Sequence, residues 1–518
     1  MIETANGKAT RWIPVPFRRR RGVATLTISL AATLPYLLGL SHGFVAEDFD
    51  VLFVSALSPE QFLQFHMRYM GRLRFLASIK DWLLYRIAGA EPIVYHAGSL
   101  ILHLIASLLL YHLVKRLSRD RRAGQVAALL FAVYPRHHGT VMWLAAGQFL
   151  LSGVFLLAGL LLFTHYLSSR RWPHLVLASI SFALALFSNE VSVIALPLTL
   201  MTEWVWARQR GSAIKAGPGG YDKYAIWLGF VALVAFMSLA GPRAFRLQPG
   251  TLDPRQRFET YQIQGISLAL AKEMVSYITY MIWPQILLWD LGVDAGSLAL
   301  AVATLAGTLL LLARGTRHER LFISWALLAL VPIVLFVPFG VADRYFYVAA
   351  MGLTAALGSA GVRLWDLLQT PRSLARWLPG AMLAMYLVTS VVALQVRALE
   401  WHRAGQMARD IVSQIIALQP EVPSNSHMFF VGLPARYGQA YIYMGGGIGS
   451  AIRMAYGDYR IQVYRSVDPD LKQWLDRAPD GISREGVYLF VYRDGVMEDH
   501  SGRVNDVKTF LNDWWWYH

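Results

Sequence analysis

The chain has 518 residues, of which 55% are hydrophobic and only 16% are charged, and its mean hydropathy is +0.40. This balance excludes an ordinary soluble protein. The absence of cysteine rules out disulfides, thiolate metal sites and cysteine nucleophiles. The formal charge of +15 comes mostly from short loops beside apolar segments, so we interpret it as an orientation signal rather than as a signal for nucleic-acid binding.

Apolar segments near the roughly 20 residues that a helix needs to cross a bilayer alternate with basic loops, and predict a polytopic α-helical membrane protein. Residues 1–21 are polar and end in four arginines, which places them in the cytoplasm by the positive-inside rule. We expect about eleven spans, at residues 22–40, 92–114, 123–134, 141–167, 175–187, 191–206, 224–240, 298–313, 321–339, 346–362 and 377–396. A further segment, 266–291, is interrupted by charged residues and proline, and is interpreted as re-entrant or interfacial.

The spans divide the chain into three parts. The cytoplasmic N-terminus, 1–21, is followed by a transmembrane domain, 22–399, with a long first outer loop at 43–91 whose mixed pattern suits amphipathic helices on the membrane surface. An odd number of crossings puts residues 400–518 on the outer side. There, a helical segment to Leu418 and strand-like runs at 427–431, 460–467 and 486–492 predict a small α/β domain.

An acidic stretch directly follows the first span. It contains Glu47, Asp48 and Asp50 within four residues. Ionised groups near hydrocarbon usually face a water-filled cavity, pair with cations or take part in chemistry. From the residues alone, a catalytic role and a structural role in ion pairing or helix capping are both open.

Four stretches make the chain resemble a known family. They are Tyr95 to Leu117, Ala128 to Trp143, Leu184 to Leu198 and Val341 to Gly352. Together with the acidic stretch, they resemble GT-C glycosyltransferases and are similar to bacterial relatives of the transmembrane-and-tetratricopeptide-repeat O-mannosyltransferases. The sequence departs from that family's pattern at Tyr134, Gly139, Gly147, Phe149 and Asn189, and it has no tetratricopeptide repeats.

The resemblance implies roles for the acidic residues. Transfer of a sugar to a hydroxyl needs a base, and a carboxylate near the attacking oxygen can serve. Asp48 is the expected base, with Glu47 as its orienting partner or a metal ligand. Asp50 is expected to be a solvated or capping residue. Glu190, between two apolar runs, is a candidate second acid or a local cap. Whether a divalent metal takes part is left open.

The leaving phosphate of a lipid-linked donor needs cations, and arginine binds phosphate with two hydrogen bonds. The candidates are Arg243, Arg246, Arg255, Arg257, Arg344 and His137. Anionic lipid headgroups are an alternative partner for the first four arginines. Arg344 could pair only with its neighbour Asp343, and His137 could simply end a short helix.

The sequence therefore predicts an integral-membrane glycosyltransferase. It would move a hexosyl or pentosyl group from a polyprenyl phosphate to a hydroxyl of a glycan, lipid or protein on the outer side of the membrane. The expected location is a bacterial inner membrane, with the C-terminal domain periplasmic or extracellular. The alternatives are a ligase or polymerase of lipid-linked glycans, and a non-enzymatic transporter or scaffold.

Overall fold

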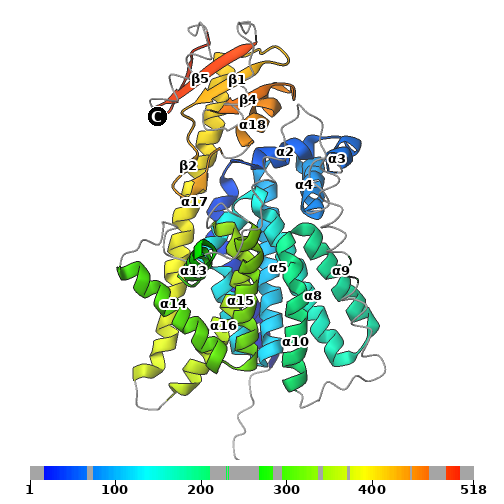
Figure 1. Cartoon of the computed structure of the whole chain (residues 1–518), viewed down its shortest axis with the longest axis vertical. Coiled ribbons are helices and arrows are strands. Elements are labelled where there is room, and N and C mark those ends of the chain that lie inside the picture. Colours follow the sequence, from blue (N-terminus) through cyan, green and yellow to red (C-terminus); the bar gives the residue numbers. More distant parts are fainter. Residues whose placement is uncertain are drawn as a thin grey trace, which may run out of the picture.

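The structure, a computed structural model, describes residues 17–66, 74–209, 268–283, 295–336, 342–369, 374–443, 446–465 and 486–501, with isolated positions between them. Figure 1 shows a helical bundle with a small sheet domain at one end. The prediction of a polytopic α-helical protein with a small C-terminal α/β domain is confirmed.

The first half of the bundle alternates long helices with short ones. Its elements are α1 (Phe17–Thr33), η1 (Leu34–Ser41), α2 (Asp48–Ala56), α3 (Pro59–Phe65), α4 (Phe75–Ala88), α5 (Pro92–Ser118), α6 (Arg121–Ala132), η3 (Pro135–His137), α7 (His138–Val141), η4 (Leu144–Ala146) and α8 (Gly147–Ser169). The second half comprises α9 (Trp172–Ser188), η5 (Glu190–Ile194), α10 (Ala195–Gln209), α13 (Leu268–Ile282), α14 (Ala295–Arg314), α15 (Arg317–Phe336), η6 (Asp343–Tyr345), α16 (Phe346–Leu367), η7 (Leu374–Trp377) and α17 (Leu378–Leu418).

Seven helical segments of the described chain are long and apolar enough to cross a membrane. They are Gly22–Ser41, Pro92–Ser118, Leu144–Ser169, Gly296–Arg314, Arg317–Leu335, Asp343–Leu367 and Leu374–Leu418. Three other expected spans correspond to the shorter helices α6, α9 and α10, and the span at 224–240 lies outside the described residues. The total of about eleven spans therefore stays a prediction, as does the re-entrant interpretation of 266–291, where α13 lies.

Small residues let the central helices pack closely. A Cβ on Gly352 of α16 would lie 2.6 Å from the Phe322 carbonyl oxygen of α15, and one on Gly358 would lie 2.6 Å from the Ala127 nitrogen of α6. Backbones that approach this closely gain dispersion contacts, which hold helices together where lipid weakens the hydrophobic driving force. Gly352 and Gly358 thus fix α16 against its two neighbours.

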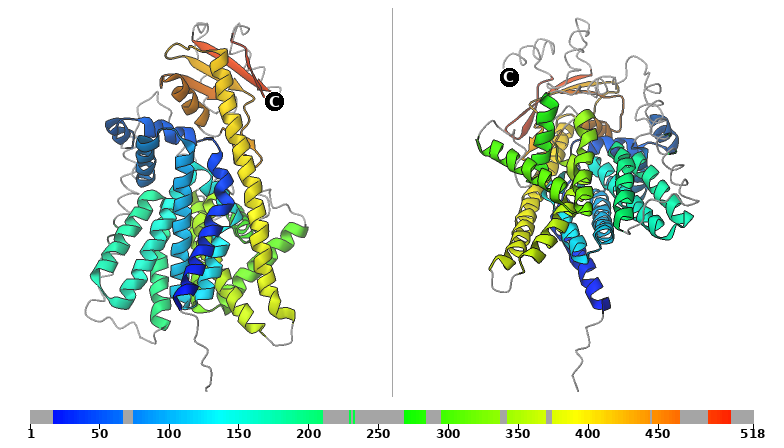
Figure 2. Two further views of the ribbon diagram at one scale, coloured as in Figure 1. Left: turned by 180° about the vertical axis from the view of Figure 1, so that it is seen from behind. Right: turned by 60° about the horizontal axis from the view of Figure 1, so that its bottom comes forward.

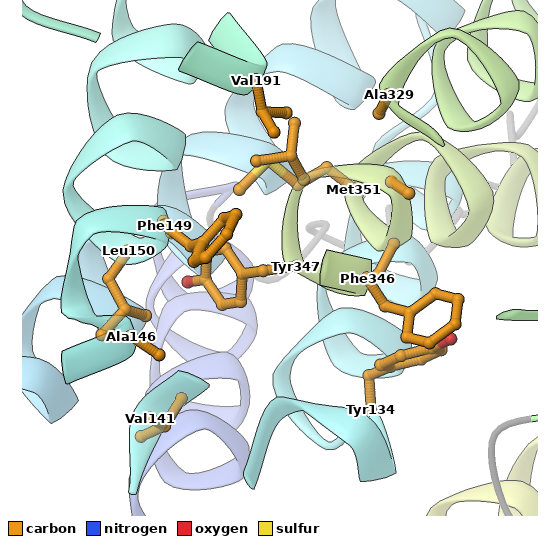
Figure 3. Close-up of a cluster of buried hydrophobic side chains, with 14 of the residues drawn as sticks. Tyr134, Val141, Ala146, Phe149, Leu150, Val191, Ala329, Phe346, Tyr347 and Met351 are labelled. Atoms are coloured by element: carbon orange, nitrogen blue, oxygen red, sulfur yellow. The ribbon is translucent and has the colours of Figure 1, made fainter. Parts of the chain in front are cut away.

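A buried aromatic layer lies where the bundle meets the loops of the end that carries the sheet. Figure 3 shows part of one cluster of buried side chains, to which Phe149 of α8, Tyr134, and Phe346 and Tyr347 of α16 belong. All four side chains are at most 3% exposed. These buried side chains support the loops at that end of the bundle.

The C-terminal domain holds a four-stranded sheet with strand order β4-β1-β5-β6. Its strands are β1 (His427–Val431), β4 (Gln462–Arg465), β5 (Val487–Arg493) and β6 (Val496–Asp499), beside the hairpin strands β2 (Arg436–Tyr437) and β3 (Ala440–Tyr441) and the helix α18 (Gly447–Tyr456). β1 pairs in parallel with β4 and β5, whereas β5 and β6 are antiparallel. The three predicted strands correspond to β1, β4 and β5.

The helix α17 joins the two parts of the molecule. It runs without a break from Leu378 to Leu418, so the expected boundary between residues 399 and 400 falls inside one continuous helix. Figure 2 shows this helix rising from the far end of the bundle into the sheet domain. The sheet domain is therefore joined to the bundle by a continuous helix rather than by a flexible linker.

The sheet domain also contacts the chain that leads into α2. The Ala46 nitrogen donates to the Ile442 oxygen at 2.8 Å. A Cβ on Gly447 would lie 2.1 Å from the Ala46 oxygen, so only glycine fits there. The Ser450 hydroxyl donates to the Asp50 carboxylate at 2.5 Å. Asp50, expected to be a solvated or capping residue, instead links α2 to α18, a partner that lies 400 residues away in sequence.

We expect Ser450→Ala to weaken this contact. Loss of a hydrogen bond to a charged group costs about 1.5–3 kcal/mol, and partial exposure of Asp50 places the effect at the lower end. Thermal unfolding of the purified protein in detergent should show a lower melting temperature than for Ser413→Ala. The Ser413 hydroxyl bonds only to a carbonyl of its own helix. Equal melting of the two variants would contradict a role for Ser450 in the domain contact.

Candidate functional site

Loops that are far apart in the sequence meet at the end of the bundle that carries the sheet domain (Figure 1). They are the acidic loop, which we define as residues 42–50, the turn from Tyr134 to Ala146, the short helix η5 and the short helix η6. The helices α7 and η6 contact each other, and α2 contacts η4. The predicted acidic residues, Glu190 and Arg344 therefore lie on one face of the molecule.

Asp48 is completely buried at the start of α2. Its two carboxylate oxygens accept hydrogen bonds from the Ala145 nitrogen at 2.9 Å and the Val45 nitrogen at 3.2 Å. Burial raises the pKa of the Asp48 carboxyl well above its ordinary value, although these two N–H groups act in the opposite direction. Asp48 thus ties the acidic loop to the turn that precedes α8.

Glu47 is half-buried, in contrast to its neighbour. Its carboxylate acts electrostatically on Arg344, which lies on η6. The Arg344 guanidinium lies 5.1 Å from the centre of the Trp143 ring and 4.6 Å from that of Tyr345, and it donates to the Tyr345 hydroxyl at 3.0 Å. Two oppositely charged side chains from half-buried residues therefore interact electrostatically in this site.

Next to Arg344 in the sequence, Asp343 takes part in a buried series of hydrogen bonds. Arg136 donates to one oxygen of Asp343 at 2.7 Å, and Nε2 of His138 lies 2.9 Å from the other. The indole N–H of Trp401 donates to Nδ1 of His138 at 3.0 Å. Because an indole can only donate, Nδ1 must be the acceptor, and the proton of His138 is on Nε2, toward Asp343. The sequence left open a local pair between Arg344 and Asp343 as the alternative to phosphate binding, but Asp343 pairs with Arg136.

His137 occupies a different environment from His138. It is fully buried, and its ring centre lies 4.5 to 5.2 Å from those of Phe131, Tyr347, Tyr134 and His103. Burial, and then the neighbouring His103, lower the pKa of His137 well below its ordinary value. A neutral ring among aromatic side chains is poorly suited to a phosphate. The phosphate-binding role of His137 stays a prediction that this environment does not favour.

Glu190 pairs with Arg74, which precedes α4 in the first outer loop. Nε of Arg74 donates to Oε2 of Glu190 at 3.1 Å, and Nη2 donates to the other oxygen. Burial acts to raise the pKa of Glu190, but Arg74 outweighs it and the pKa is lowered. A carboxylate that is kept ionised by two hydrogen bonds from an arginine is a weak candidate for a general acid.

We expect Glu190→Gln to have a small effect on stability. The side chains of Arg74 and Glu190 are 35% and 42% exposed, and ion pairs open to solvent contribute about 0–1 kcal/mol. The melting temperature should therefore shift by no more than a few degrees. A large drop would show that the pair is a structural element of the loop, and the charge-reversed pair Arg74→Glu with Glu190→Arg would serve as its control.

A second buried carboxylate lies close to the acidic loop. Asp81 of α4 is 6% exposed, is paired with Lys80 and acts electrostatically on Asp48. Within the described ranges, no group of three or more acidic or histidine side chains is placed to hold a metal ion. A metal-binding role for Glu47 therefore stays a prediction.

Four of the predicted phosphate ligands, Arg243, Arg246, Arg255 and Arg257, lie outside the described residues. Sequence reasoning did not select Arg136, His138, Asp343 or Trp401 as site residues. The signal for Arg136 and His138 was present in the polar segment Pro135 to His138 between two apolar runs. Nothing in the sequence pointed to Trp401, because its partner lies 263 residues away.

Residues 78–239 match the family model described as dolichyl-phosphate-mannose-protein mannosyltransferase. The resemblance to membrane glycosyltransferases is confirmed. The matched segment contains Arg136, His138, Trp143 and Glu190, whereas the acidic loop and η6 lie outside it. The chain is also 26% identical over 244 residues to the protein O-mannosyl-transferase Tmtc1 of Drosophila melanogaster. That alignment covers 44% of this chain and only 28% of the relative.

Two solved structures share a distant similarity with most of the chain. One is the oligosaccharyltransferase of Archaeoglobus fulgidus, tethered to an acceptor peptide, with 12% identity, a TM-score of 0.48 and coverage of 88% of this chain and 64% of that one. The other is ArnT from Cupriavidus metallidurans bound to undecaprenyl phosphate, with 13% identity, a TM-score of 0.44 and coverage of 92% and 94%.

Proposed function

We propose that the protein is a membrane glycosyltransferase that moves one sugar from a polyprenyl phosphate to a hydroxyl group of an acceptor. The observation that carries the proposal is the electrostatic interaction between the carboxylate of Glu47 and the guanidinium of Arg344, in two residues that are each only half-buried. The match to a mannosyltransferase family over 78–239 supports it, and makes mannose the first sugar to test.

The chemistry requires a base and a cation on opposite sides of the reacting carbon. The acceptor oxygen attacks the anomeric carbon and loses its proton to a carboxylate, while the bond from that carbon to the phosphate oxygen breaks. The polyprenyl phosphate leaves with the bonding electron pair. A guanidinium stabilises this growing charge. Attack opposite to the leaving group inverts the anomeric centre.

We assign the base to Glu47 and a positioning role to Asp48, which reverses the expectation from the sequence. A base has to come within about 2.6–3.2 Å of the proton that it takes. Both oxygens of Asp48 already accept backbone N–H groups, and the residue is fully buried. Glu47 is the more exposed of the two residues, and its carboxylate acts electrostatically on the proposed phosphate ligand Arg344.

The face that carries the sheet domain is proposed to be the outer side of the membrane. The four arginines of Arg18 to Arg21 precede the first span, and the positive-inside rule assigns them to the cytoplasm. The left view of Figure 2 shows α1, in dark blue, beginning at the end of the bundle that lies opposite the sheet domain. In a bacterial inner membrane the site would then face the periplasm.

The test is transfer by the purified protein in lipid nanodiscs. Radiolabelled polyprenyl phosphate mannose, glucose and arabinose would each be supplied with peptide and glycolipid acceptors. We expect label from one monophosphate donor to appear on one class of acceptor. Transfer of a whole glycan from a polyprenyl diphosphate would instead indicate a ligase. Binding of donors without transfer to any acceptor would indicate a transporter or scaffold.

A further inference from the structure

The hairpin of the C-terminal domain contacts both α17 and one of the loops of the site. The β2–β3 hairpin carries Tyr441, whose ring centre lies 4.9 Å from that of Trp143 and 6.3 Å from that of Trp401. Tyr441 also acts electrostatically on Arg344. A residue from the sheet domain thus contacts the same tryptophan that lies against the guanidinium of Arg344.

The hairpin is held firmly in this place. Next to Tyr441, the Ile442 nitrogen donates to the Ala435 oxygen at 2.9 Å, and the Ile442 oxygen accepts from the acidic loop. The Tyr443 hydroxyl donates to the Ala408 oxygen of α17 at 2.6 Å. Because the residues that follow Tyr441 are bonded both to α17 and to the acidic loop, its position relative to Glu47 and Arg344 is fixed.

The indole N–H of Trp143 is buried without a hydrogen-bond acceptor among the described residues. The residue is 3% exposed. A buried N–H without a partner is destabilising because it has given up its hydrogen bond to water, so such groups are uncommon unless a ligand satisfies them. This orphaned donor lies in the aromatic group that surrounds Arg344.

The ligand that suits this group is rich in oxygen and negatively charged. The guanidinium of Arg344, the indole N–H of Trp143 and the hydroxyl of Tyr441 are all donors. Tyr441 is half-buried as a residue, and within the part of the chain that the structure describes its hydroxyl accepts one long hydrogen bond, of 3.4 Å, from Arg436. Donors of this kind beside aromatic rings can bind the phosphate and the hydroxyls of a sugar phosphate.

We propose that Trp143, Arg344 and Tyr441 form one subsite for the sugar-phosphate head of the lipid-linked donor, completed by the C-terminal domain. This inference rests on the proposed function for the identity of the ligand. It makes the sheet domain part of the binding site, because Tyr441 is supplied by that domain. The subsite would be incomplete in a chain that ends before the hairpin.

The experiment measures binding rather than transfer, so it stands apart from the test of the proposed function. Tritiated farnesyl phosphate mannose and farnesyl phosphate are bound to the full-length protein in nanodiscs. We expect Tyr441→Ala to weaken binding of the sugar-bearing probe about tenfold. Tyr437→Ala, on the same hairpin but in contact with Arg403 instead, is the matched control and should bind like the wild type.

The sugar-free probe separates the two parts of the head. An equal loss for both probes would place Tyr441 against the phosphate, and a loss confined to the mannose probe would place it against the sugar. Both results support the subsite. Tyr441→Phe, which keeps the ring, should lose less than Tyr441→Ala. If Tyr441→Ala melts like the wild type and binds both probes with wild-type affinity, the subsite is refuted.

Discussion

Glu47→Gln is expected to abolish most of the transfer activity while leaving the fold intact. The glutamine keeps the shape of the side chain but cannot accept a proton, and loss of a general base lowers rates by about 10²–10⁴-fold. Because Glu47 is half-buried rather than enclosed, the substitution should leave the melting temperature nearly unchanged. The measurement is the initial rate of sugar transfer at saturating donor, beside thermal unfolding of the same preparation.

Two neighbouring carboxylates provide the controls for this experiment. Asp48→Asn should mainly lower the melting temperature, because an amide can accept only one of the two backbone N–H groups that Asp48 accepts. Asp50→Asn keeps an oxygen for the Ser450 hydroxyl and should retain most activity. If Glu47→Gln transfers sugar at the wild-type rate while a fully folded Asp48→Asn protein is inactive, the base is Asp48 after all.

The broad architecture could be predicted from the sequence because it depends on local pattern. Apolar runs of the length of a bilayer predict helices wherever they occur, and the alternating segments at 427–431 and 486–492 match β1 and β5 closely. The expected domain boundary near residue 400 falls inside a helix for a physical reason. The helix α17 continues beyond its apolar part because residues such as Trp401 and Ile411 pack on one face.

The details of the site depend on contacts between distant segments, which a local pattern does not encode. The sequence placed Glu47 and Asp48 at the membrane boundary but could not show which of them is enclosed. That difference arises because α2 begins at Asp48 and turns its carboxylate toward Ala145, which lies 97 residues away. The positive φ of 45° at Ala46 belongs to the same turn and has no sequence signature.

The role of Asp50 shows the same limit. The sequence predicts a solvated or capping role because Asp50 follows the pair Glu47 and Asp48. No pattern near Asp50 in the sequence indicates that Ser450 is its partner. Only the folded sheet domain brings α18 against α2. At Gly447 of α18 the Ala46 oxygen lies so close that a Cβ would not fit.

The buried pair of Arg136 and Asp343 should be the most sensitive structural element of the site. Their side chains are 4% and 11% exposed, and Arg136 also donates to the Tyr280 oxygen at 3.0 Å. Asp343→Ala would leave the guanidinium buried without its carboxylate. Breaking a buried pair in this way costs about 3–5 kcal/mol. We expect a large fall in melting temperature, or failure of the protein to accumulate in the membrane.

A double variant separates the loss of the pair from the exposure of one charge. Arg136→Met with Asp343→Leu removes both charges and fills similar volume, which is often neutral for stability. It should therefore melt well above Asp343→Ala, and the difference measures how much of the damage comes from the orphaned Arg136. If the double variant is as unstable as Asp343→Ala, the essential contact is instead the one between Asp343 and His138. His138 is also bonded to Trp401 of α17. The position of α17, the helix that carries the sheet domain, would then depend on Asp343.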